Sequence, residues 1–189
     1  MPIAVAEQRS LPSQNRPFST VRTDPARMVV AIRRAAGGLR QLSDQSLGDF
    51  TECLREKGAT ENGQSDDFLC AAFAAAWEAV RRVHGIEMYD VQLMAGLALV
   101  RGNVAEMQTG EGKTISAVAP AFARTVAGDS VHVATVNDYL AGRDYVQVQP
   151  VFDLLKLSVG LLKPNSQMDE KRTAYCCDVT YANNVATGQ

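Results

Sequence analysis

The stretch EMQTGEGKT, from Glu106 to Thr114, decides how the rest of the chain is interpreted. Its last five residues match the G-x-G-K-T core of a phosphate-binding loop, although Met107 stands where the strict pattern has its first glycine. Glycines let backbone N–H groups turn toward phosphate oxygens, and Lys113 can then reach the β- and γ-phosphates. Because the first glycine is the one least involved with phosphate, the pattern predicts nucleotide binding rather than a structural turn.

Outward from this loop, strands and helices are expected to alternate. The sequence predicts strands at residues 103–107, 130–135, 158–162 and 178–182, and helices near residues 113–127, 137–155 and 167–176. Alternation at this spacing is typical of a parallel sheet with crossover helices. The loop then follows a strand and opens a helix, which is the context that the phosphate-binding motif requires.

The N-terminal part of the chain has a different pattern. Residues 1–22 contain three prolines and no periodicity, which predicts a flexible arm. Residues 23–87 hold three stretches with apolar residues on one helical face, and each begins with a capping residue. The expected organisation is therefore an arm over 1–22, a helical segment over 23–87 and an α/β domain over 88–189.

Composition narrows the classes of function. The net charge of −2 argues against a large non-specific nucleic-acid footprint. No apolar run approaches the roughly 18 residues that a membrane-spanning helix needs. The four cysteines have no metal-ligand spacing, so buried, reduced thiols in a cytoplasmic protein are expected.

The phosphate-binding loop suggests functional roles for two further parts of the sequence. Gln92 lies on an expected helix, and its amide could both donate to and accept from an adenine edge, although a solvated glutamine would have the same pattern. The segment TVNDYLAGRD follows the second expected strand, where Asn137 or Asp138 can cap the next helix. The same segment could instead sense substrate or nucleotide state, and the residues alone leave both interpretations open.

At these residues the chain resembles the SecA family, the motor ATPases of bacterial preprotein export. The similarity rests on several ordered segments and runs from about residue 25 to about residue 184. They are LSDQSLGDF, AFAAAWEAVRRVHGIEMYDVQLMAG, AEMQTGEGKT, VHVATVNDYLAGRD and, after LSVGLL, RTAYCCDVTYANN. The family also has methionine in place of the first glycine, and generic helicases share the T-G-x-G-K-T core without these neighbours.

The resemblance implies part of a RecA-like P-loop NTPase fold that takes ATP and Mg²⁺ as cofactors. Gln92 would hold adenine, and Thr114 would ligate the magnesium ion. The phosphates would lie on Gly110, Glu111, Gly112, Lys113 and Thr114. The implied partners are ATP or ADP, the SecYEG channel, preproteins and an anionic lipid surface, with no nucleic acid. Family members often dimerise, and they are cytoplasmic proteins peripheral to the inner membrane.

One departure from the family bears on turnover. The acidic Walker B motif, Asp-Glu-x-Asp, does not occur in these 189 residues, so we expect the α/β domain to be truncated before it. Phosphoryl transfer needs such a carboxylate, so this chain alone is expected to bind nucleotide, with no catalytic residue of its own. The alternatives are a stand-alone, non-hydrolysing binding module and a non-functional truncated remnant. A nucleic-acid helicase fragment is disfavoured by the acidic charge balance.

Overall fold

The computed structural model describes residues 4–7, 24–60, 63, 65–163 and 166–183. Within these residues, the N-terminal part is helical, as expected. Its helices are α1 (Pro25–Leu39), α2 (Asp44–Thr60), α3 (Asp66–His84) and α4 (Asp90–Val100). The capping residues are used as predicted, since Asp24 accepts a hydrogen bond from the Ala26 N–H and Ser65 accepts one from the Phe68 N–H.

Helix α3 forms the centre of the molecule. Its middle is rich in alanine, and Ala72 to Ala76 are fully buried, which lets neighbouring helices approach closely. It contacts α1, α2, α6 (Val118–Val126) and α7 (Asp138–Leu154), so helices from both halves of the chain pack on it. One hydrophobic core therefore runs from the N-terminal helices to the sheet.

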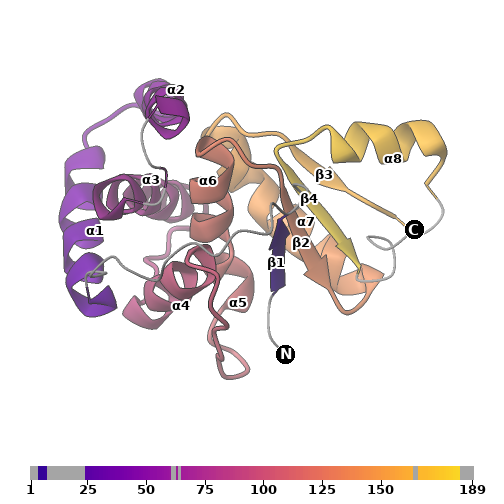
Figure 1. Ribbon diagram of the computed structural model, residues 1–189, viewed down its shortest axis with the longest axis horizontal. Helices are drawn as coiled ribbons and strands as arrows, with labels where there is room; N and C mark the ends of the chain where they lie inside the picture. Colours follow the sequence, from indigo (N-terminus) through magenta and orange to yellow (C-terminus); the bar gives the residue numbers. More distant parts are fainter. Residues whose placement is uncertain (1–3, 8–23, 61–62, 64, 164–165, 184–189) are drawn as a thin grey trace, which may run out of the picture.

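The second half of the chain is an α/β arrangement. After the short helix α5 (Lys113–Ser116) and α6 come β2 (Val131–Thr135), α7, β3 (Val159–Leu161), α8 (Met168–Tyr175) and β4 (Val179–Asn183). Strands β2, β4 and β3 are parallel and neighbours in that order. Figure 1 shows the N-terminal helices at one side, the sheet at the other and α6 between them. The α/β fold class expected from the alternating pattern is confirmed.

The two faces of the sheet are covered by different elements. Val131, Val133, Val179 and Tyr181 point into the main core, on the face where α7 packs against β4 and β3. The opposite face carries Ala182, which packs with Ala174 of α8 in a smaller cluster. Such alternation follows from the period of two along a strand.

Three details of the sequence-based expectation are wrong. Residues 103–107 form no strand with the described residues, and Val104 is 85% exposed. The helix expected over 113–127 is broken at Ala117, because Pro120 lacks the N–H that would bond to the Ser116 carbonyl. Residues Ala4–Glu7, expected in a flexible arm, form strand β1, which pairs antiparallel with β2. Most of the predicted arm lies outside the described residues.

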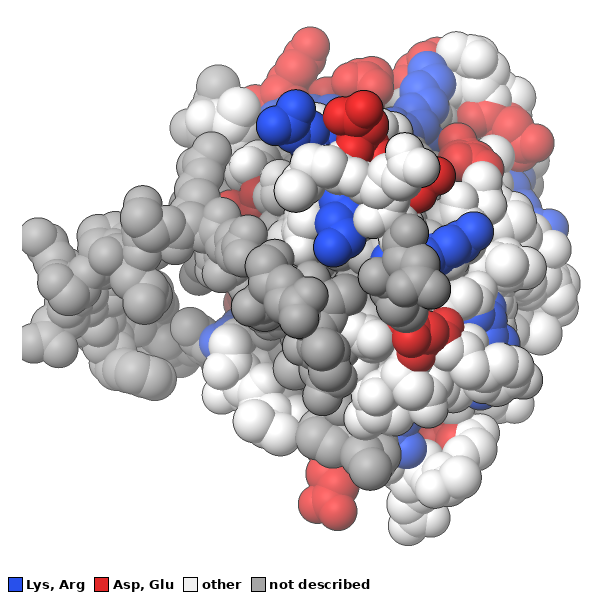
Figure 2. Space-filling view, turned by 90° about the vertical axis from the view of Figure 1, so that its right-hand side faces the viewer, with Lys and Arg blue, Asp and Glu red and all other residues white. Residues whose placement is uncertain are grey.

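The described surface carries charges of both signs. On the face seen in Figure 2, basic and acidic side chains are interspersed over the described residues. Among these residues, no helix combines the length and apolar character that crossing a membrane requires. All four cysteines are free thiols, but the expectation that they are buried is wrong, since Cys53 and Cys176 are exposed and Cys70 and Cys177 are only half-buried.

Candidate functional site

The loop between residue 107 and helix α5 has a backbone that only glycine adopts without strain. Gly110 has φ +91° and Gly112 has φ +73°, both in the left-handed region. Within the described residues, the N–H groups of Gly110, Gly112, Lys113 and Thr114 donate to no backbone acceptor outside a helix or strand. These donors are available to an anion, as the first turn of a helix also leaves them.

The loop is held closed by its own polar groups. The Gln108 N–H donates to Glu111 Oε2 at 2.7 Å, and Lys113 Nζ donates to the Gln108 carbonyl at 2.9 Å. The lysine ammonium group therefore lies across the loop and is held by a neutral carbonyl oxygen. A phosphate oxygen would form a stronger, charge-assisted bond with the same group.

Gln92 connects the loop to helix α4. Its side chain is 6% exposed, and its Oε1 accepts from the Tyr89 N–H at 2.9 Å. Its Nε2 donates to the Glu111 carbonyl, also at 2.9 Å. The structure thus brings together Gln92 and the loop that the sequence singled out separately. Gln92 is therefore not a solvated surface glutamine, since its amide is buried and hydrogen-bonded at both ends.

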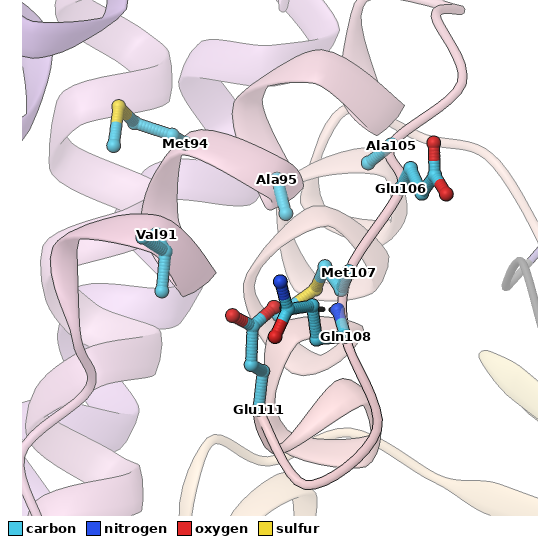
Figure 3. A pocket seen from close by; sticks show the side chains of 8 residues that line it. All are labelled: Val91, Met94, Ala95, Ala105, Glu106, Met107, Gln108 and Glu111. Atoms are coloured by element: carbon cyan, nitrogen blue, oxygen red, sulfur yellow. Dashed lines mark hydrogen bonds between the residues drawn. The ribbon is translucent and has the colours of Figure 1, made fainter.

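An open pocket of about 570 Å³ lies between α4 and the loop. This volume is within the range of small-molecule sites, which is roughly 300–1,000 Å³. In Figure 3, Val91 and Ala95 of α4 lie across the pocket from Met107 and Glu111, while the Glu106 carboxylate points away. The remaining lining residues are Met94, Ala105 and Gln108. The pocket has both apolar and polar walls, as a ring system attached to phosphates would require.

Thr114 has a partner that sequence reasoning did not identify. Its hydroxyl donates to Asp144 Oδ1 at 3.0 Å, and the Asp144 side chain is 13% exposed. Asp144 belongs to TVNDYLAGRD, the segment for which the sequence allowed two interpretations, helix capping and the sensing of substrate or nucleotide state. Asn137 in that segment caps α7, since its Oδ1 accepts from the Leu140 N–H. The segment therefore supplies a cap at one end and a contact to the loop at the other.

The residues present fit a magnesium nucleotide. Two glycines with positive φ, a lysine and free backbone N–H groups suit phosphate oxygens. The Thr114 hydroxyl, with a carboxylate beside it, offers the oxygen atoms that Mg²⁺ prefers. Bound Mg²⁺ would neutralise charge on the phosphates.

Comparison with known proteins gives consistent matches. The family model described as the SecA DEAD-like domain matches residues 14–188. The chain is 43% identical over 160 residues to the protein translocase subunit SecA of Alcanivorax borkumensis, covering 84% of this chain and 17% of the relative. It is 41% identical over 170 residues to the chloroplastic protein translocase subunit SECA1 of Arabidopsis thaliana, covering 89% of this chain and 16% of the relative.

A third relative is the protein translocase subunit SecA 2 of Mycolicibacterium vanbaalenii, 45% identical over 149 residues, covering 79% of this chain and 17% of the relative. The chain thus spans about a sixth of the length of the relatives it matches. The family model spans nearly all of the chain, including the phosphate loop, α4 and the parallel strands. The chain belongs to the SecA DEAD-like domain family, and its α/β fold is part of a RecA-like domain.

Proposed function

We propose that this chain is the ATP-binding portion of a SecA-type motor, which couples ATP hydrolysis to the translocation of preproteins across the bacterial inner membrane. The observation that carries the proposal is the loop itself. Gly110 and Gly112 have positive φ angles, which let backbone N–H groups of the loop turn toward an anion, and Lys113 and Thr114 follow Gly112 directly. The same loop borders a pocket of about 570 Å³.

Each residue has a distinct role in this proposal. The free N–H groups of the loop and the Lys113 ammonium group bind the β- and γ-phosphates. The Thr114 hydroxyl ligates Mg²⁺. Gln92 is bonded to the carbonyl of Glu111, a residue that lines the pocket, and in this proposal its amide contacts the adenine ring. ATP and ADP are the expected ligands.

Calorimetric titration with ADP and with ATP, in the presence of Mg²⁺, tests the proposal. Lys113→Ala is expected to weaken ADP binding by about 10- to 100-fold, because a hydrogen bond to a charged group contributes about 1.5–3 kcal/mol. Lys163→Ala is the matched control, since Lys163 is an exposed lysine outside the loop and the pocket. Equal affinity in the parent and in Lys113→Ala would refute the proposal.

Turnover requires a separate assay. We expect ATP hydrolysis by this chain alone to be far slower than by its full-length relatives, because no Asp-Glu-x-Asp motif is in the sequence. Hydrolysis at a comparable rate would contradict that expectation. By family membership we also propose that the SecYEG channel, preproteins and anionic lipid are partners of the whole motor, which works at the cytoplasmic side of the membrane.

A further inference from the structure

The direction of the hydrogen bond from Thr114 to Asp144 decides which way the lone pairs of the Thr114 hydroxyl point. A hydroxyl group has a single proton and two lone pairs. Because the Asp144 carboxylate can only accept, the Thr114 proton points toward it, across the 3.0 Å between Oγ1 and Oδ1. The lone pairs of the Thr114 oxygen then face away from Asp144 and remain available to a cation.

Asp144 is well placed to hold this orientation. It lies on α7, which contacts α5 and packs against β4. The guanidinium group of Arg143 donates to the same Oδ1 through Nε at 2.9 Å and through Nη2 at 2.7 Å. With a side chain only 13% exposed, the carboxylate is shielded on most sides.

Asp144 is also within electrostatic reach of β4. Burial and, to a lesser extent, the charge of Asp144 raise the pKa of Tyr181, which belongs to β4. The bonds from Thr114 and Arg143 to the same Oδ1 fix the orientation of the carboxylate.

We propose that Asp144 is a positioning residue for magnesium, which it serves through Thr114 rather than by direct contact. This inference rests on the proposed function, since it concerns the cation that accompanies the nucleotide. Groups that orient a metal ligand in this way commonly change metal affinity by about 10- to 100-fold when they are removed. A purely structural role in α7 would instead alter nucleotide binding with and without the cation alike.

The test measures ADP affinity by calorimetry in excess MgCl₂ and again in EDTA. The ratio of the two affinities measures how much bound Mg²⁺ strengthens the binding of ADP. Asp144→Ala is expected to reduce this ratio at least about tenfold and to leave the affinity in EDTA unchanged. Asp144→Asn keeps an acceptor oxygen and should retain a larger part of the ratio. Asp153→Ala, an exposed aspartate on the same helix, is the control and should match the parent.

The possible outcomes separate the two proposals. An unchanged ratio in both Asp144 variants would overturn the positioning role and leave the proposed function intact. Equal losses with and without Mg²⁺ would also overturn it, because they indicate a structural role. If the parent protein binds ADP equally in MgCl₂ and in EDTA, only this inference fails, whereas absence of ADP binding in both conditions would overturn the proposed function as well.

Discussion

Gly112→Ala is the substitution whose effect the structure defines best. Gly112 has φ +73°, and an alanine held there is strained by about 1–2 kcal/mol. Its Cβ would also lie 2.4 Å from Gln92 Nε2, which is too close for any real contact. Gln92 must then move and give up its bonds to the Tyr89 N–H and the Glu111 carbonyl.

These effects set the expected magnitude. Each lost hydrogen bond contributes about 1 kcal/mol, so Gly112→Ala should lower the free energy of unfolding by about 3–4 kcal/mol in all. Gly110→Ala is the matched control. Its φ is +91°, but nothing lies within 4 Å of the added Cβ, so only backbone strain of about 1–2 kcal/mol is expected.

Urea denaturation followed by circular dichroism measures both variants, with the slope of each transition compared to confirm two-state unfolding. The double variant Gln92→Ala/Gly112→Ala completes the test. In the Gln92→Ala background, Gly112→Ala should cost only as much as Gly110→Ala, because the clash is gone. If Gly112→Ala destabilises the parent no more than Gly110→Ala does, the reasoning about Gln92 is refuted.

Three further predictions concern the helical part of the chain. The pKa of Glu78, which is 1% exposed, lies below its ordinary value of 4.5, chiefly because Arg81 donates a hydrogen bond to it. The ionised Glu78 carboxylate therefore stabilises the fold above about pH 4.5, and this contribution is lost as the pH falls through the folded-state pKa. Glu78→Gln should therefore make the urea midpoint less dependent on pH in that range. Gly58→Ala should destabilise by about 1–3 kcal/mol, since its Cβ would lie 2.2 Å from the Val126 carbonyl oxygen. Gly37→Ala, with nothing within 4 Å, should instead stabilise α1 by about 1 kcal/mol in the same urea titration; destabilisation by Gly37→Ala or a neutral Gly58→Ala would contradict the packing argument.

The helices were predictable because their signals are local. Asp24 caps α1 and Ser65 caps α3, and both contacts span three residues or fewer. The strand expected at residues 103–107 was wrong for the opposite reason. A short run of strand-favouring residues indicates an extended backbone. A strand also needs a neighbouring strand to pair with, and no local pattern reveals whether one is there. Strand β1 was missed because its pairing with β2 joins positions far apart in the chain.

In the candidate site, too, local features were predictable from the sequence and contacts between distant segments were not. The motif predicted the loop, since spacing alone places its glycines, Lys113 and Thr114 together. Asp144 could not be identified, because its bond to Thr114 spans 30 residues and depends on how α7 packs beside α5. The burial of Gln92 against the Glu111 carbonyl likewise depends on the packing of α4, so only its residue type was informative.

Strand β1 has a consequence for how the protein behaves in concentrated solution. An uncovered strand edge is a template on which other chains assemble and aggregate. Here Ala4–Glu7 pair with one side of β2, and the strand at the far end of the sheet, β3, is only three residues long. Among the described residues, the sheet therefore presents only short runs of unpaired backbone groups along either border.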